Sequence, residues 1–197
     1  STSNGLDRFD GRDFIHFSTH SSQSATRLAN DFVYGVSEDS CGRIWAISDG
    51  GLFCIGPESS EIRYFEGFVP EFNGMMSRSN SAIVRSQGDS FWVAGRGRLM
   101  HFSVDASGEP VDLVRSASLR GLMPGSLCVQ GNQVWMGGFA GVRCFSLDQS
   151  GQIQEVPVSV GEELSSLRGV SAICASGSIL WLGSFRGLFR MDLVTGI

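Results

Sequence analysis

The stretch Leu180-Trp181-Leu182-Gly183-Ser184-Phe185-Arg186-Gly187-Leu188 decides the fold, because its pattern recurs along the whole chain. In each copy a tryptophan stands inside a short apolar run, and an aliphatic residue follows it seven positions later. Gaps of 47, 43 and 46 residues separate the four tryptophans, which are Trp45, Trp92, Trp135 and Trp181. Repetition at a period of this length is typical of proteins built as arrays of like units.

Turn glycines repeat together with the tryptophans. A glycine precedes the aliphatic residue in three copies, at Gly51, Gly141 and Gly187, and Arg98 takes that place in the second copy. A fifth copy of this segment, without its tryptophan, stands at Gly5-Leu6-Asp7-Arg8-Phe9. The shared register favours a true repeat over the alternative, a two-sheet sandwich in which the tryptophan spacing is a coincidence.

Each unit contains four short segments of strand length, rich in β-forming residues and bounded by Gly, Ser and Asp. In the first complete unit these segments are residues 32–36, 43–47, 52–55 and 61–65. Four strands in about 45 residues make one blade of a β-propeller. We therefore predict an all-β fold, a β-propeller or partial propeller of about four blades with four antiparallel strands each. Because one blade cannot bury both of its faces, we expect the tryptophans to fill the layers between blades.

The repeat also predicts the domain organisation, a single propeller array over residues 1–197. The expected parts are a partial blade at 1–20, blades at 21–68, 69–115 and 116–158, and a partial blade at 159–197. Such an array is either a closed four-bladed ring or part of a larger ring, and we favour the second. An open array would leave an apolar blade face uncovered, so we expect the chain to form a homo-oligomer.

Composition excludes several classes of function. The net charge is −5 and all 15 basic residues are arginine, so the chain has no basic patch for nucleic acid and no lysine for a Schiff base or a phosphate loop. No apolar run approaches the roughly 20 residues that span a membrane, so we expect no membrane contact within this chain. The five cysteines lack metal-ligand spacing, and repeat-equivalent ones such as Cys54 and Cys144 are interpreted as small core hydrophobes.

The sequence holds no catalytic motif, and we expect no catalytic residue, no metal site and no cofactor in it. The informative positions are the turns four residues after each tryptophan, where the scaffold is constant but the side chain varies. We predict that these turns share one face with the long loops between blades and bind a small molecule or carbohydrate there. The candidate ligand-binding residues are Asp49, Arg96, Phe139, Phe185 and Arg186.

The run Asp39-x-x-Gly42-x-Ile44-Trp45-x-x-Ser48-x-x-Gly51-Leu52 resembles the two-component regulator propeller repeat. The fourth copy matches that repeat best downstream of its tryptophan, and the second copy departs most from it, with Gly95 and Arg98 at two motif positions. The resemblance implies a non-catalytic, ligand-sensing or signal-relaying module of a bacterial signalling protein. It also implies a periplasmic or extracytoplasmic location, with a cytoplasmic one as the alternative, and a histidine kinase or diguanylate cyclase output domain outside these residues.

Two other functions stay open at this stage. A propeller enzyme, such as a metal-dependent lyase, would need histidine and acidic residues near the axis, and His20 and Glu71 in interblade loops are the candidates. A protein-interaction scaffold without a small ligand has no sequence feature that separates it from a sensor.

Overall fold

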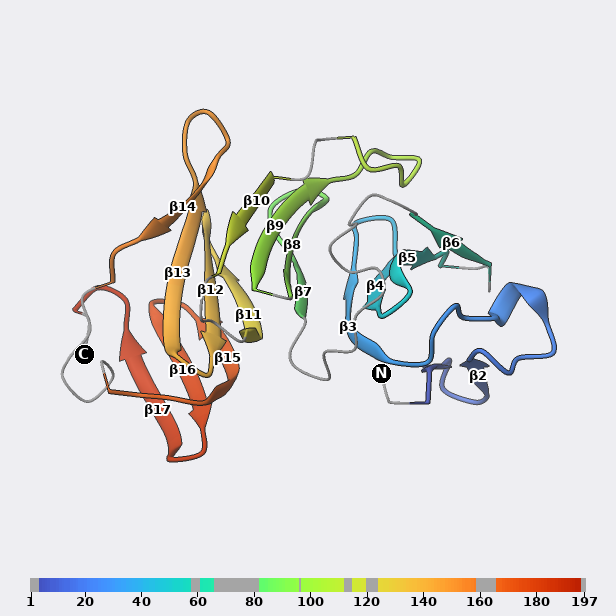
Figure 1. The fold of residues 1–197 in the computed structure, drawn as a ribbon, viewed down its shortest axis with the longest axis horizontal. Coiled ribbons are helices and arrows are strands. Elements are labelled where there is room, and N and C mark those ends of the chain that lie inside the picture. The colour runs from blue at the N-terminus through green and yellow to red at the C-terminus, as the bar shows by residue number, and fades with distance from the viewer. Residues whose placement is uncertain are drawn as a thin grey trace. The chain divides into compact units, whose positions relative to one another are not determined.

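The computed structural model describes residues 4–57, 61–65, 82–95, 97–111, 115–119, 124–158 and 166–195. In these ranges all paired strands are antiparallel, and the only helical element is the 3₁₀ turn η1, Ser24–Thr26. The chain divides into two compact units, Ser1–Arg78 and Ser79–Ile197. Each unit consists of short sheets whose strands follow one another in sequence order (Figure 1).

The first unit holds two sheets. The two-stranded one joins β1 (Leu6–Phe9) to β2 (Phe14–Phe17). The four-stranded one has the order β3-β4-β5-β6, and its strands are β3 (Val33–Glu38), β4 (Ile44–Ser48), β5 (Gly51–Ile55) and β6 (Ile62–Tyr64).

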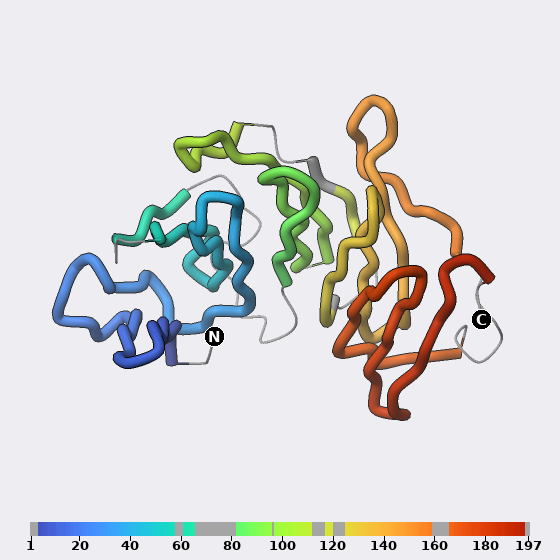
Figure 2. The backbone as a smooth tube through the Cα atoms, turned by 180° about the vertical axis from the view of Figure 1, so that it is seen from behind, coloured from blue at the N-terminus to red at the C-terminus, as the bar shows by residue number. Residues whose placement is uncertain are grey.

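The second unit holds three sheets with the same up-and-down course, seen from behind in Figure 2. The first comprises β7 (Ala82–Arg85), β8 (Ser90–Gly95), β9 (Arg98–Ser103) and β10 (Arg115–Ser118). The second comprises β11 (Pro124–Gln130), β12 (Gln133–Gly138), β13 (Gly141–Leu147) and β14 (Ile153–Val156). The third comprises β15 (Val170–Ser176), β16 (Ile179–Ser184) and β17 (Gly187–Asp192).

These sheets confirm the predicted all-β fold and its four-stranded antiparallel blades. One boundary differs from the sequence expectation. The predicted division between residues 115 and 116 falls inside β10, because Arg115–Ser118 pairs with β9 and completes the preceding sheet. The polar sequence of β10 gives little signal of its own, and its pairing with β9 decides to which sheet it belongs.

The backbone conformation explains the glycine that precedes the aliphatic residue in the repeat. Gly51 and Gly141 begin the third strand of their sheets with φ of 106° and 111°, a region that side chains strongly disfavour. The second copy, which has Arg98 at this position, places the positive φ of 71° one residue earlier, at Gly97. The arginine is therefore accommodated by a shift of the turn rather than by strain.

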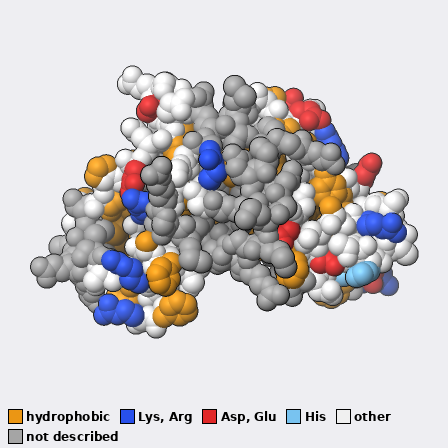
Figure 3. Space-filling view, viewed as in Figure 1, with side chains coloured by type: hydrophobic (Ala, Val, Ile, Leu, Met, Phe, Trp, Pro, Cys, Tyr) orange, Lys and Arg blue, Asp and Glu red, His pale blue; other side chains and the backbone are white. Residues whose placement is uncertain are grey.

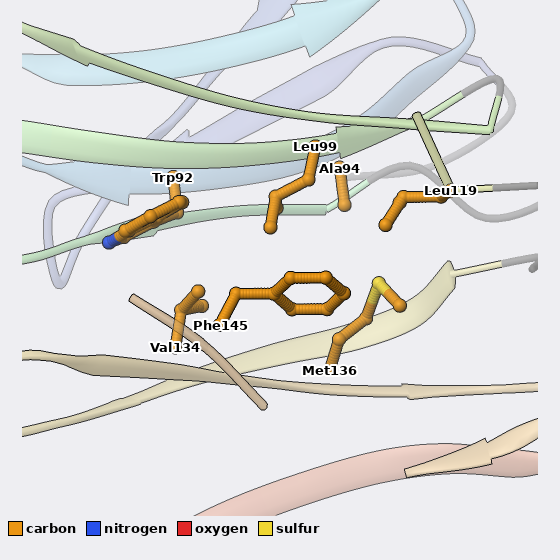
Figure 4. Close-up of a cluster of buried hydrophobic side chains, with 7 residues drawn as sticks. All are labelled: Trp92, Ala94, Leu99, Leu119, Val134, Met136 and Phe145. Carbon is orange, nitrogen blue, oxygen red and sulfur yellow. The ribbon is translucent and has the colours of Figure 1, made fainter. Parts of the chain in front are cut away.

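The core of the second unit forms layers between successive sheets. Figure 4 shows one such layer, in which Trp92 and Leu99 of one sheet point toward Val134, Met136 and Phe145 of the next. Strand alternation turns Trp135 to the opposite side of β12 from Val134 and Met136. There it packs with Leu180 and Leu182 of β16 in the next layer. The predicted place of the tryptophans is confirmed for these two.

Trp181 differs from its three counterparts. Trp45, Trp92 and Trp135 are at most 4% exposed, whereas Trp181 is 39% exposed. Its neighbour Leu182 is fully buried, so the sheet is firmly packed on one face and open on the other.

A feature missed from the sequence is a repeated irregularity in the first strand of the sheets. The pairing register shifts between Val33 and Gly35 in β3, between Pro124 and Ser126 in β11, and between Val170 and Ala172 in β15. A β-bulge thus recurs at the same place in three of the described sheets.

Candidate ligand-binding face

The turn at Asp49 lies beside the long loop before β3, as the sequence predicted for that pair. The Asp49 amide donates to the carbonyl of Phe32 over 3.4 Å. A methyl group built on Gly50 would lie 3.0 Å from Cβ of Ala29. The Asp49 carboxylate accepts a hydrogen bond of 2.5 Å from the Tyr34 hydroxyl. At least one of its oxygens is therefore engaged in a contact within the protein.

The loop between β2 and β3 is organised by Asp31. Its carboxylate accepts hydrogen bonds from the backbone amide and the hydroxyl of Thr19, at 2.6 and 2.7 Å. The amide of Thr19 is the main cause of the lowered pKa of Asp31, and His20 and His16 add to it. Next to this loop lies a hollow of about 440 Å³, lined by Phe14, Ile15, His16, Ser21, Ser22, Gln23 and Thr26.

In the second unit the turn aromatics of two neighbouring sheets meet at one glycine. The amide of Gly169 donates to the carbonyl of Phe139 over 3.1 Å. A methyl group built on Gly169 would lie 2.6 Å from Cδ2 of Phe185. Phe139 and Phe185 are nevertheless 64% and 90% exposed. Two large apolar side chains therefore stand in solvent in turns that both adjoin Gly169.

Arginines accompany these aromatic rings. Arg186 follows Phe185 in the same turn, where its amide donates to the Ser184 hydroxyl over 3.1 Å and its side chain is exposed. Arg168 precedes Gly169, and its Nη1 donates to the carbonyl of Leu167 over 2.8 Å. In Figure 3 hydrophobic and arginine side chains gather at the lower left, over the end of β16 and β17.

The structure therefore brings together three of the five predicted residues. Phe139, Phe185 and Arg186 stand at one end of the sheets of the second unit, whereas Asp49 belongs to the first unit. Arg96 lies outside the described residues. Sequence reasoning missed Gly169, although a loop glycine directly before a strand is a signal that could have pointed to it.

Two further hollows lie away from these turns. A groove of about 530 Å³ in the first unit is lined by Leu6, Asp7, Arg8, Phe9, Phe17, Val36, Glu38, Gly42, Ile44, Ile55, Gly56 and Pro57. A smaller one of about 210 Å³ in the second unit includes Trp135 and Asp192. Asp192 ends β17, so this hollow lies at the opposite end of that strand from Phe185. Neither groove was predicted.

Groups with catalytic potential are engaged in local contacts. Nδ1 of His16 lies 2.7 Å from the carboxylate of Asp7, and the His101 ring packs against Trp92 with centroids 4.7 Å apart. Among the described residues no three His, Cys, Asp or Glu side chains cluster as metal ligands would. Glu71 lies outside the described residues, so its role as a candidate residue of a propeller enzyme, together with His20, stays a prediction.

The cysteines of the described structure are free thiols. Cys54 and Cys144 are buried, as expected of core hydrophobes, and burial raises the pKa of Cys144 to about 12. Cys128 is half-buried, and its sulfur accepts a hydrogen bond from the amide of Ala175 in the next sheet. Cys41 and Cys174 are exposed, and for Cys174 this differs from the interpretation of repeat-equivalent cysteines as core hydrophobes.

Comparisons with known proteins support the propeller fold. No family model matches the chain, and no curated protein matches it either. Among solved structures, PorZ of Porphyromonas gingivalis, a surface component of the type-IX secretion system, aligns with a TM-score of 0.72 at 17% identity. That alignment covers 97% of this chain and 30% of PorZ.

The extracellular domain of the hybrid two component system BT3049 from B. thetaiotaomicron aligns with a TM-score of 0.67, again at 17% identity. The alignment covers the whole of this chain and 27% of the other, so this chain spans about a quarter of the length of that extracellular domain. Virginiamycin B lyase from Staphylococcus aureus aligns with a TM-score of 0.59 at 14% identity, covering 92% of this chain and 56% of the enzyme. At these identities the similarities establish the fold.

No helix in the described parts of the chain has the length and apolar character needed to cross a membrane.

Proposed function

We propose that this chain is a non-catalytic sensing or signal-relaying module of an extracytoplasmic bacterial signalling protein. The observation that carries the proposal is the alignment of the whole chain with the extracellular domain of BT3049. The repeat motif around Trp45, which resembles that of two-component regulator propellers, supports it independently of the structure. A kinase or diguanylate cyclase output domain in the same protein is part of the proposal.

The proposed ligand contacts are the rings of Phe139 and Phe185 and the guanidinium of Arg186. Exposed aromatic rings present flat apolar faces on which a planar group or the apolar face of a sugar ring can stack. An adjacent guanidinium donates hydrogen bonds to hydroxyl or carboxylate groups. The combination fits a small polar molecule or a carbohydrate that has one apolar face.

A thermal-shift screen with neutral and acidic oligosaccharides tests this proposal. A ligand present at about 100 times its dissociation constant stabilises the fold by roughly 2.7 kcal/mol. We expect Phe185→Ala and Arg186→Ala to abolish the shift. Phe9→Ala is the matched control, because Phe9 is also an exposed phenylalanine, at 56%, but belongs to the first unit.

The outcomes separate the site from the function. A shift that survives both substitutions in the second unit but is lost in Gln23→Ala would move the ligand to the hollow beside η1. The absence of any shift across the panel would favour a protein-interaction scaffold instead.

A further inference from the structure

The hairpins that precede two of the buried tryptophans are built alike. In the hairpin between β3 and β4, the amide of Asp39 donates to the carbonyl of Arg43 over 3.0 Å. In the hairpin between β7 and β8, the amide of Ser86 donates to the carbonyl of Ser90 over 2.7 Å. Asp39 and Ser86 each stand six residues before the tryptophan of their sheet. Ser86 therefore has in its sheet the place that Asp39 has in the first unit.

The two equivalent positions differ in size and charge. The carboxylate of Asp39 is buried and accepts the indole N–H of Trp45 over 3.0 Å. Ser86 is smaller and uncharged, and the indole N–H of Trp92 has no hydrogen-bond partner among the described residues, although Trp92 is only 2% exposed. A buried indole N–H usually has a partner, because an unpaired buried donor is costly. Within the described residues, the second sheet thus lacks the acceptor that the first sheet supplies.

A hollow of about 270 Å³ lies beside this tryptophan, which is far more space than one water molecule needs. Its lining comes from two neighbouring sheets of the second unit and consists of Ser86, Gln87, Ser90, Trp92, His101, Asn132 and Leu147. Figure 4 shows the indole nitrogen of Trp92 pointing away from the other labelled side chains, toward the end of β8 at which Ser90 stands. Asn132 directly precedes β12 and Phe139 directly follows it, so the hollow lies at the opposite end of that strand from the proposed ligand contacts.

The lining of this hollow offers hydrogen-bond donors and one apolar wall. The hydroxyl of Ser86 and the side-chain amides of Gln87 and Asn132 make no hydrogen bond to the described residues. These groups can donate, and the indole N–H can only donate. Leu147 of β13 supplies the apolar wall, and no acidic side chain is among the lining residues. Because a carboxylate accepts strong, charge-assisted hydrogen bonds at both oxygens, the lining fits a short carboxylic acid in its ionised form.

We propose that this hollow binds a small monocarboxylate, whose carboxylate takes the place that the Asp39 side chain has in the first unit. One of its oxygens accepts the indole N–H of Trp92, and the other accepts the hydroxyl of Ser86. The amide of Asn132 donates from the facing sheet, and a short aliphatic tail lies against Leu147. Because Ser86 and Asn132 belong to different sheets, the bound molecule connects the two sheets.

The indole resonances in a proton–nitrogen NMR spectrum test this site directly. The chain has four tryptophans, and the resonance that disappears in Trp92→Phe belongs to Trp92. Titration with sodium propionate is expected to move this resonance downfield until the site is saturated, because a hydrogen bond to a carboxylate deshields the indole proton. Propionamide has the same shape without the charge, and it is expected to move the resonance much less. Sodium chloride at equal ionic strength is the control for salt.

Substitutions in the lining separate this site from a general effect of the ligand. Ser86→Asp returns to this hairpin the carboxylate that the first unit has. It is expected to move the Trp92 resonance downfield without any ligand and to abolish the response to propionate. Ser178→Asp, in the exposed turn between β15 and β16, is the matched control and keeps the response. Asn132→Ala is expected to weaken propionate binding roughly tenfold, as the loss of one hydrogen bond to a charged group does.

The resonances of the other three tryptophans show whether each variant is folded. A Trp92 resonance that does not respond to propionate in the wild-type chain would overturn the proposal. So would equal responses to propionate and propionamide, or a response that survives Ser86→Asp in a folded chain. If Ser86→Asp does not fold, an unchanged affinity in Asn132→Ala would overturn it instead. These measurements leave Phe139 and Phe185 untouched, so their result is independent of the test of the proposed function.

Discussion

The indole N–H of Trp45 donates a hydrogen bond of 3.0 Å to Oδ2 of Asp39, the same oxygen that accepts from Nε of Arg43. The other oxygen of Asp39 accepts from the amides of Cys41 and Arg43. A buried carboxylate thus ties the hairpin turn between β3 and β4 to the tryptophan of the repeat.

Trp45 and Trp135 are expected to differ in what their indole nitrogens contribute. The Trp135 Nε1 is buried without a hydrogen-bond partner among the described residues, whereas that of Trp45 binds a carboxylate. Hydrogen bonds to charged groups contribute about 1.5–3 kcal/mol, so Trp45→Phe should cost more than Trp135→Phe by roughly that amount. Urea unfolding of both variants measures the difference, and equal losses would show that packing alone decides.

Replacing Asp39 should be among the most damaging single substitutions in the first unit. Asp39→Asn keeps the volume but removes the charge that Arg43 and Trp45 meet. Breaking a buried ion pair costs about 3–5 kcal/mol. Asp105→Asn is the matched control, since Asp105 makes similar turn bonds on the surface. Similar losses for the two variants in urea unfolding would contradict this interpretation.

The same carboxylate makes stability depend on pH. Burial acts to raise the pKa of Asp39, but the hydrogen bonds from Trp45 and Arg43 outweigh it, so the pKa lies below its ordinary value of 3.8. A depressed pKa means that the unfolded chain binds the proton first. The stabilisation is therefore complete above pH 3.8 and is lost as the pH falls through the lower, folded-state value.

In urea titrations the gap in unfolding free energy between wild type and Asp39→Asn should be constant near neutral pH and narrow below pH 3.8. A gap that stays constant down to the acid transition would mean that Asp39 is not ionised in the folded protein.

Two equivalent glycines should respond differently to alanine. A methyl group built on Gly137 would lie 2.6 Å from Cγ1 of Val170 in the next sheet, whereas on Gly183 it would meet only Ala172, at 3.3 Å. Overpacking costs typically about 1–3 kcal/mol, so Gly137→Ala should lose that much stability. Gly183→Ala should be close to neutral. Equal losses of stability for the two variants would contradict the observed layering of the sheets.

The five thiols should label in an order set by burial. Cys41 and Cys174 are exposed, whereas Cys54 and Cys144 are buried and the pKa of Cys144 is raised to about 12. Because the thiolate is the reactive form, an alkylating reagent at pH 8 should modify the exposed pair first. Mass spectrometry over time gives the order. Unfolding in urea should make all five equally reactive, and early labelling of Cys144 would show that its layer opens.

The sequence was most informative where one residue has one physical role. Trp92 and Trp135 lie in the layers between sheets because large apolar side chains need a second surface, and Gly51 begins a strand because only glycine tolerates its φ. Those signals depend on local chemistry and on the repeat, so they were readable without a structure.

The features that were missed depend on a neighbour distant in sequence. The exposure of Trp181 depends on what covers its sheet. The environment of Phe185 depends on Gly169, a loop residue whose backbone lies beside the Phe185 ring. The assignment of β10 to its sheet likewise depends on pairing with β9 rather than on the sequence of β10. None of these relationships leaves a pattern within a single repeat.

The up-and-down order of the strands has a consequence for synthesis and evolution. Since each described sheet is built from strands consecutive in sequence, the backbone hydrogen bonds of β11–β14 can be completed as soon as Val156 has left the ribosome. Each sheet can then dock on its predecessor while translation continues, with no strand waiting for a distant partner. Duplication or loss of one whole repeat would likewise change the number of stacked sheets without leaving any strand unpaired, which allows such a gene to grow or shrink by complete units.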